Sequence, residues 1–180
     1  MKDKLTKRAK REGYKARSAY KLLELNNKYH IIKRNSRVLD LGCWPGSWLQ
    51  VVSKITDNVV GVDLRETKIE DVRTYVMDIF SDEILKLGRF DVILSDVAPR
   101  TSGNIEIDQF KSYELSSRAF EIAKKLLNKN GNFLVKIFQG IDSDKLLREM
   151  KKYFTLAKGI KPSSSKKKSK EIYYIGLGFR

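Results

Sequence analysis

Residues 37–48 read Arg-Val-Leu-Asp-Leu-Gly-Cys-Trp-Pro-Gly-Ser-Trp, and no other stretch of the chain says more about its structure. The stretch starts as a short apolar run and stops at Gly42, which is typical of a buried parallel strand that opens into a loop. A helix is expected to follow over about residues 47–55. Gly42 and Gly46 carry no side chain, so a ligand can approach the loop backbone closely. The stretch therefore predicts a strand, a ligand-binding loop and a helix.

The rest of the chain alternates between strand and helix patterns. Apolar residues at helical spacing predict helices at about 14–29, along a face through 115–126, and around 146–150. Asn130-Gly131 can end the second of these helices with a left-handed residue. Further strands are expected at 58–63, 73–77, 90–96, 132–138, 153–157 and 171–179. This alternation predicts an α/β fold, with a mostly parallel seven-stranded sheet flanked by helices in one Rossmann-like domain over residues 1–180.

The positive charge of the chain is concentrated at its two ends. The 180 residues include 37 Lys+Arg and 22 Asp+Glu, which gives a formal net charge of +15. Residues 1–37 hold 13 basic and 3 acidic residues, residues 141–180 hold 11 and 4, and the middle holds 13 and 15. Such segregation favours a polyanionic partner, most often a nucleic acid. We expect residues 1–13 to form a flexible basic arm and residues 161–170 a basic Ser/Lys loop.

Composition also excludes several classes of protein. Cys43 is the only cysteine, which rules out an internal disulfide framework and a multi-cysteine zinc site, and we expect no metal. No apolar stretch approaches the roughly 18–20 residues that a membrane span needs. The basic amino terminus is not followed by the apolar segment of a secretory signal. We therefore expect a cytoplasmic protein with no membrane partner, acting as a monomer.

Acidic residues close two of the strands beside the glycine loop. Ligands of parallel α/β sheets collect at these carboxyl ends. The loop is neither a Gly-x-Gly-x-x-Gly fingerprint nor a phosphate-binding P-loop, so a nucleotide cofactor without a pyrophosphate fits better. Asp63 stands where a ribose-binding acid belongs, and Asp78 could accept a hydrogen bond from an adenine amino group. Together with Gly42 and Gly46 they predict an S-adenosylmethionine site; the alternative is a tight turn with aspartates that cap helices.

Two further polar residues suggest catalysis. Asp96 ends a predicted strand, in Ser-Asp-Val-Ala-Pro at 95–99, and Lys136 lies inside the apolar strand 133–138. A buried ammonium without a partner is very costly, so Lys136 must be paired, belong to a site, or extend its amine to the surface from a strand end.

With these residues the sequence resembles the FtsJ/RrmJ-like ribose 2′-O-methyltransferases, most closely the bacterial-type members that act on large-subunit ribosomal RNA. The likeness runs from about residue 17 to residue 180. It is carried by Arg-Ser-Ala-Tyr-Lys-Leu at 17–22, Asp-Leu-Gly at 40–42, Pro-Gly-Ser-Trp at 45–48, Ser-Asp-Val-Ala-Pro at 95–99, Val-Lys-Ile-Phe-Gln-Gly at 135–140 and Ser-Lys-Glu-Ile-Tyr at 169–173.

The resemblance implies a set of site residues. The family's catalytic tetrad falls on Lys21, Asp96, Lys136 and Glu171. Its cofactor contacts fall on Gly46, Trp48, Asp63, Asp78 and Asp96. The chain departs from the family at Cys43-Trp44, where two alanines are usual, and at Ser47, where a second glycine is usual. We expect the bulky Trp44 to reshape the approach to the methionine end of the cofactor, and Cys43 to pack the loop rather than act as a nucleophile.

The chemistry of ribose methylation agrees with this tetrad. A ribose 2′-hydroxyl is a poor nucleophile, so it must be aligned with the sulfonium methyl while its proton is removed. Lys136 can accept that proton only in its neutral form, which the positive charges of Lys21 and the cofactor favour. Asp96 would orient Lys136, and Glu171 would position Lys21 or the ribose.

The resemblance implies methylation of a uridine ribose in the A loop of large-subunit ribosomal RNA. The substrate could be the free RNA or the assembled subunit. The same tetrad serves family members that act on tRNA or on mRNA caps. A different class of hypothesis is a non-catalytic RNA-binding or assembly protein on the same fold. A dinucleotide-dependent oxidoreductase is a third hypothesis, which the missing glycine fingerprint disfavours.

Overall fold

The protein is built on a seven-stranded sheet, as the sequence predicted. The computed structural model describes residues 4–165 and 169–180. The strands follow the order β3-β2-β1-β4-β5-β7-β6 across the sheet. Their bounds are β1 Val38–Leu41, β2 Val59–Asp63, β3 Arg73–Val76, β4 Phe90–Ser95, β5 Leu127–Phe138, β6 Phe154–Ile160 and β7 Glu171–Phe179. The first five strands are parallel, and β7 runs antiparallel to both of its neighbours.

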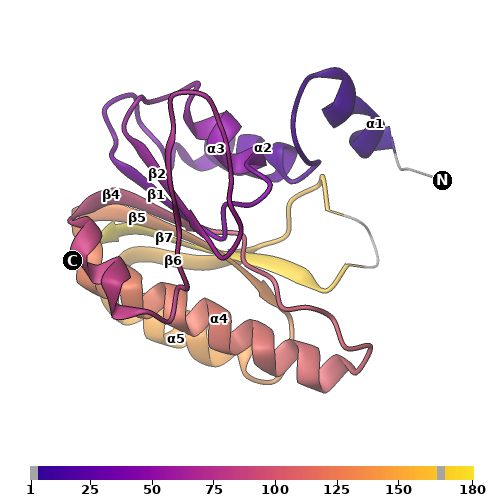
Figure 1. Cartoon of the computed structure of the whole chain (residues 1–180). Helices are drawn as coiled ribbons and strands as arrows, with labels where there is room; N and C mark the ends of the chain where they lie inside the picture. The colour runs from indigo at the N-terminus through magenta and orange to yellow at the C-terminus, as the bar shows by residue number, and fades with distance from the viewer. Residues whose placement is uncertain (1–3, 166–168) are drawn as a thin grey trace.

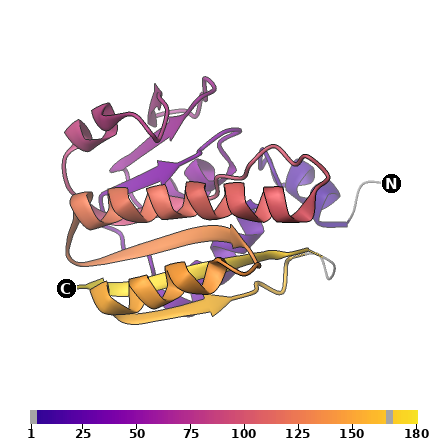
Figure 2. The ribbon, with the colours of Figure 1, turned by 90° about the horizontal axis from the view of Figure 1, so that it is seen from below.

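Helices cover both faces of this sheet (Figure 1). They are α1 Lys4–Arg11, α2 Ala19–Tyr29, α3 Ser47–Val52, α4 Ile105–Leu126 and α5 Ser143–Tyr153, with a 3-10 helix at Asp82–Leu87. In Figure 1, α2 and α3 lie above the sheet and α4 and α5 below it. Figure 2 shows α4 and α5 running along the lower face. In the part of the chain that the structure describes, no helix is both long and apolar enough to cross a membrane.

Alternation along the strands produces two apolar layers. Successive side chains of a strand point to opposite faces, so one strand can serve both layers. Leu39 and Leu41 of β1 pack with α4 on one face, whereas Val38 packs with α2 and α3 on the other. The same rule sends Val135 of β5 toward α4 and Leu134 toward α2. A side chain's register in its strand therefore determines which helices it meets.

Residues 4–11 of the expected basic arm form a helix, α1, which the sequence did not predict. Ala9 of this helix is buried, with 2% of its surface exposed. Glu12, just beyond the helix, pairs with the Arg8 guanidinium at 2.7 Å and accepts a hydrogen bond from the Tyr20 hydroxyl at 2.8 Å. The sequence concealed the helix because it has too few apolar residues to show a period. Residues 1–3 lie outside the described range.

The long helix also ends earlier than predicted. α4 stops at Leu126 and β5 starts at the next residue, so Asn130-Gly131 lies inside the strand and caps no helix. Asn130 does adopt the left-handed conformation, with φ 64°. The pairing register between β4 and β5 shifts at this place, which marks a bulge. A side chain at Gly131 would have its Cβ 2.9 Å from the Asp91 carbonyl oxygen, so only glycine fits here.

The segment between β6 and β7 docks on α2. The Glu24 carboxylate accepts hydrogen bonds from the Ser163 amide and from the amide and hydroxyl of Ser164. The Arg17 guanidinium donates to the Ser164 carbonyl at 2.6 Å. We call these contacts the α2 clasp. Of the basic loop expected at 161–170, residues 166–168 lie outside the described residues.

Gly176 in β7 provides a test of this packing. Its Cβ, if present, would lie 2.6–2.8 Å from three ring carbons of the buried Phe154 in β6. A ring inside a packed layer cannot move away cheaply, so Gly176→Ala should lower the free energy of unfolding by about 1–3 kcal/mol. Gly159→Ala is the comparison and should cost less, because its Cβ would lie 3.0 Å from the flexible end of Ile172 and 3.1 Å from the Tyr174 ring, both looser contacts than those at Gly176. Equal losses in urea unfolding of the two variants would contradict this packing.

Candidate active site

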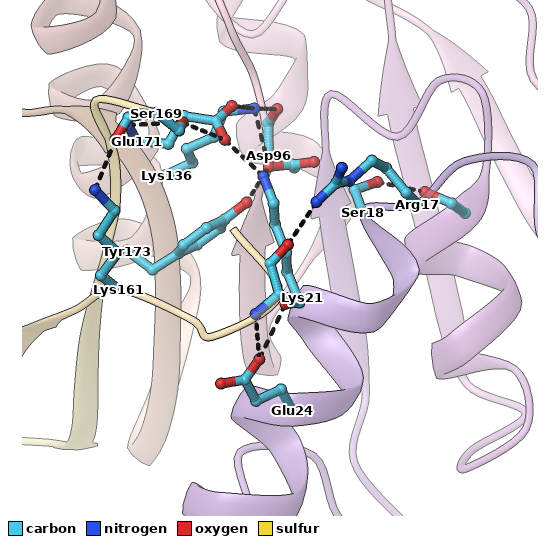
Figure 3. A network of polar contacts seen from close by, with 12 residues as sticks. Arg17, Ser18, Lys21, Glu24, Asp96, Lys136, Lys161, Ser169, Glu171 and Tyr173 are labelled. Atoms are coloured by element: carbon cyan, nitrogen blue, oxygen red, sulfur yellow. Dashed lines mark hydrogen bonds and ion pairs between the residues drawn. The ribbon is translucent and has the colours of Figure 1, made fainter. Parts of the chain in front are cut away.

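Strand register brings the predicted catalytic residues to one place. Lys136 alternates with Val135 and Ile137, whose side chains pack against α4, so Lys136 points to the face that carries α2. Its partner across the antiparallel pair is Tyr173 of β7, and Glu171 lies two residues away on the same face. Asp96 directly follows β4, the parallel neighbour of β5. Lys21 projects from α2 toward this group (Figure 3).

The four charged side chains form one connected network. The Lys136 amine lies 2.9 Å from Asp96 Oδ1 and also donates to the Asp96 carbonyl oxygen at 2.7 Å. The same amine is 3.8 Å from Glu171 Oε1. The Lys21 amine donates to Glu171 Oε2 at 2.6 Å. The two lysines and two carboxylates are therefore paired within a largely buried cluster, which is one of the placements that the sequence left open for Lys136.

Burial and charge act in opposite directions on Glu171. Burial alone would raise the pKa of its carboxyl group, but the positive charge of Lys136 and the hydrogen bond from Lys21 outweigh it. The net result is a pKa below the usual range for glutamate. Glu171 is thus held as a carboxylate between the two lysines. Ser169 supports it with a hydroxyl hydrogen bond at 3.2 Å.

Tyr173 belongs to this network, although sequence reasoning did not select it. Its hydroxyl donates to Asp96 Oδ1 at 2.8 Å. Burial, reinforced by the charges of Asp96 and Glu171, raises the pKa of the Tyr173 hydroxyl well above its usual value, so the group remains a donor. Tyr173 thereby fixes the carboxylate that faces Lys136. The available signal was the motif at 169–173, which ends at this tyrosine.

Both glycines of the loop after β1 have a left-handed backbone and close neighbours. Gly42 and Gly46 adopt φ values of 74° and 107°, a region that other residues rarely enter. A Cβ at Gly42 would lie 2.3 Å from Val97 Cγ2, and one at Gly46 would lie 2.5 Å from Ile69 Cδ1. Both positions therefore require glycine, on conformational and on steric grounds. The two glycines therefore let the loop backbone pack closely against Val97 and Ile69.

Asp63 and Asp78 lie at the same sheet edge as the loop. Asp63, at the end of β2, accepts hydrogen bonds from the Trp44 amide at 3.0 Å and from the Arg65 amide at 2.9 Å. Asp78 follows the adjacent β3 and accepts from the Phe80 amide at 2.9 Å. Both aspartates thus shape local turns, and neither caps a helix. Each carboxylate retains further acceptor capacity for a ligand.

Trp48 has a structural position that the sequence left open. Its side chain is only 2% exposed, its indole N–H donates to the Ser18 carbonyl at 3.0 Å, and its ring lies 6.0 Å from that of Tyr173. Trp48 therefore connects α3 to α2 and supports the network from behind. Its contact with a cofactor stays a prediction.

The loop residues that differ from the family pattern also have defined places. Burial raises the pKa of the Cys43 thiol to about 12, so a thiolate nucleophile is disfavoured at neutral pH. This agrees with the expectation that Cys43 packs the loop. Trp44 is 48% exposed, and the Arg65 guanidinium lies 4.3 Å from the centre of its ring. The bulky side chain thus stands at the outer rim of the loop.

Asp40 is an unpartnered acid beneath the loop. Only 1% of its surface is exposed, and neither carboxyl oxygen has a hydrogen-bond partner in the structure. Burial, with the nearby charges of Asp96 and Asp63, raises the pKa of this carboxyl group well above its usual value. Orphaned buried acceptors are rare in native proteins and usually imply a donor from a ligand or water. Together with the two glycines and acids at the strand ends, Asp40 fits a cofactor that carries amino and hydroxyl donors.

Residues 4–165 and 169–180 contain no cluster of side chains that could bind a metal ion. No group of three or more His, Cys, Asp and Glu side chains lies close enough together there to hold an ion.

The mostly parallel seven-stranded sheet, with helices on both faces, is a Rossmann-like α/β fold. The family model for FtsJ-like methyltransferases matches residues 14–179. The chain belongs to this family.

Curated relatives and a solved structure agree with this membership. A ribosomal RNA large subunit methyltransferase E from Methanothrix thermoacetophila is 46% identical and covers 97% of this chain and 72% of its own. The protein of the same name from Borreliella afzelii is 40% identical, with 99% of both chains covered. The crystal structure of a Plasmodium falciparum protein described as a ribosomal RNA methyltransferase superimposes with a TM-score of 0.82, at 32% identity over 92% of this chain and 98% of its own.

Asp40 gives the unliganded protein a specific pH dependence. Its folded-state pKa is raised, so the stability cost of Asp40 is absent below the ordinary aspartate pKa of about 4 and grows as pH rises toward the folded pKa. Asp40→Asn removes this cost and should melt above the wild type at pH 7, with the two melting temperatures converging near pH 4. Each 1 kcal/mol gained would raise Tm by about 2–4 °C.

Leu41→Met, a volume-conserving change in the same strand, is the control and should show no such pH trend. If the difference in melting temperature between Asp40→Asn and wild type stays constant from pH 4 to pH 8, the raised pKa of Asp40 is contradicted.

Proposed function

We propose that the protein is an S-adenosylmethionine-dependent methyltransferase that modifies a ribose 2′-hydroxyl in RNA. The observation that carries this proposal is the network of Lys21, Asp96, Lys136 and Glu171 at the carboxyl edge of the sheet. It places a buried lysine between two carboxylates and leaves a second lysine close by. Family membership supports the methyltransferase chemistry.

The residues of the chain divide the catalytic work as follows. Lys136, with its amine neutral, would accept the proton of the 2′-hydroxyl at its Nζ while the ribose oxygen takes the methyl carbon. The bond from that carbon to the sulfonium sulfur of the cofactor would break, which leaves a neutral thioether. Asp96, held by Tyr173, sets the direction of the Lys136 amine. Glu171 holds Lys21, whose positive charge would stabilise the ribose oxygen as its proton leaves.

The glycine loop and the acids beside it hold the cofactor in this proposal. Gly42 and Gly46 admit it to the backbone, Asp63 accepts from the ribose hydroxyls and Asp78 from the adenine amino group. Trp48 lines the site from the core, and Asp96 adds a negative charge. When bound, S-adenosylmethionine supplies an electrophilic methyl group on a sulfonium.

We propose a uridine in the A loop of large-subunit ribosomal RNA as the target. Curated relatives that are 40–46% identical carry the name ribosomal RNA large subunit methyltransferase E, which supports this class of RNA. The positive charge of residues 1–37 and 141–180 suits a long polyanion, and an assembled ribosomal subunit would offer one. The enzyme would then work in the cytoplasm, as a monomer.

The RNA class can be tested by parallel methyl transfer. Wild-type protein and labelled S-adenosylmethionine are incubated in three separate reactions, one with large ribosomal subunits, one with free large-subunit rRNA and one with bulk tRNA. All three RNAs lack the modification. Label should enter the subunits or the free rRNA. Preferential transfer to tRNA would contradict the ribosomal assignment, and transfer to none of the three would favour a non-catalytic RNA-binding protein.

Lys136 should be required for the chemical step. Lys136→Ala removes the proton acceptor and should lower kcat/KM by at least about 10²–10⁴-fold in the methyl-transfer assay, with cofactor affinity by calorimetry nearly unchanged. Lys129→Ala, which truncates an exposed lysine of the same strand, is the control and should keep full activity. Near-normal turnover by Lys136→Ala would overturn its role.

Binding of RNA should depend steeply on salt. If the protein contacts about four phosphates, a fourfold rise in salt should weaken RNA binding roughly 100-fold. Fluorescence anisotropy of labelled rRNA measures this affinity. Lys10→Gln, on the exposed side of α1, should reduce the salt slope by about one. Lys86→Gln, in the near-neutral middle of the chain, is the control. If RNA binding by the wild type does not depend on salt, the proposal that the basic residues 1–37 and 141–180 bind RNA phosphates is contradicted.

A further inference from the structure

A pocket of about 530 Å³ opens beside the catalytic network, and the functions assigned so far make no use of it. Its volume is in the range of small-ligand sites. The start of α2, the first turns of α4, the end of β5 and the start of β7 all contribute to its wall. We propose that this pocket receives the base and phosphate of the target nucleotide, turned out of the RNA. The inference rests on the proposed ribose methylation.

The pocket shares two wall residues with the catalytic network. Lys21 and Glu171 line it and are also joined by the 2.6 Å ion pair. In Figure 3, Glu171 lies to one side of the Lys21 amine and Arg17 to the other. A nucleotide in the pocket therefore has its ribose next to the network. The glycine loop after β1 contributes no lining residue, so cofactor and nucleotide would occupy separate sites.

Two apolar side chains give the pocket a surface suited to a base. Ile105, the first residue of α4, leaves 55% of its side chain exposed, and Phe138 at the end of β5 is half-buried. Neither belongs to the two apolar layers of the sheet. The flat face of an unstacked base packs on aromatic and aliphatic side chains of this kind. Such a contact gives the exposed Ile105 a function that packing within the chain does not.

Charge at the pocket favours a phosphate group. Arg17 and Lys170 line it from opposite segments, whereas the third cation, Lys21, is already paired with the Glu171 carboxylate in the same wall. The acidic wall residue Asp108 already accepts hydrogen bonds from the amide and hydroxyl of Ser102. Arg17 is also held by the α2 clasp through Ser164, which fixes the position of its guanidinium. A phosphate next to the target ribose would meet these cations.

A polar side chain near the apolar surface can read the edge of a base. The Gln109 amide group is oriented by its hydrogen bond to the Gln139 carbonyl oxygen. Its remaining donor and acceptor match the Watson–Crick edge of a flipped base. A nucleotide within a duplex could not enter the pocket, since its base is stacked and paired. The pocket thus selects a nucleotide from a loop or from a locally opened helix.

Two neighbouring isoleucines provide a matched test. Ile105 and Ile107 lie in the same first turn of α4, are 55% and 44% exposed, and differ in that only Ile105 lines the pocket. Ile105→Asp should raise KM for methylation of free large-subunit rRNA by about tenfold or more, because a carboxylate would repel the phosphate and offer no surface to the base. Ile107→Asp should stay within about twofold of the wild type. Cofactor affinity and Tm should match in both variants.

A second arm measures binding without chemistry. The affinity of a fluorescent single-stranded RNA is compared among the three proteins at a salt concentration that suppresses general phosphate contacts. Weaker binding by Ile105→Asp alone would support the nucleotide pocket, even if the protein methylates no RNA. Absence of methylation by the wild type would refute the proposed function but not the pocket. Equal effects of the two variants, or none from Ile105→Asp in either arm, would overturn the pocket.

Discussion

The positive charge of a lysine amine inside a sheet has to be balanced by acidic partners, and several elements of this structure supply or hold those partners. Lys136 is buried at the point where β5 meets both β4 and β7, and it faces Asp96 and Glu171. Removing one partner from such a buried group leaves an uncompensated charge, which is strongly destabilising. The network is therefore a structural constraint as well as a candidate catalytic device. Tyr173 and Lys21 complete it, each by holding one of the two acids.

The two ends of the chain close the site over the middle. Lys21 and Glu171 are 150 residues apart in sequence, yet their side chains form the shortest ion pair of the network. The α2 clasp joins the same two regions through Glu24 and Ser164. The near-neutral middle supplies the glycine loop and Asp96. The basic ends therefore contribute both catalytic residues and positive charge, which explains why the excess charge is segregated.

Residues at strand ends were the most predictable part of the molecule. The seven strands and the meeting of Asp96 with Lys136 follow from the rule that parallel strands share a carboxyl edge. Tyr173 was not selected, because a residue in an apolar strand does not reveal which partners its register gives it. α1 stayed hidden because it has too few apolar residues to show a helical period, although its Ala9 is buried. Asn130-Gly131 was misplaced because a helix cap and a strand bulge use the same left-handed conformation.

The chemical position of the transferred methyl group tests the central claim most directly. RNA that the wild-type protein has methylated with labelled S-adenosylmethionine is digested to nucleosides and separated by chromatography with mass spectrometry. The arrangement of Lys136 between Asp96 and Glu171 predicts that the label is found in a single 2′-O-methylated nucleoside, on the ribose. Label on a base would contradict the account.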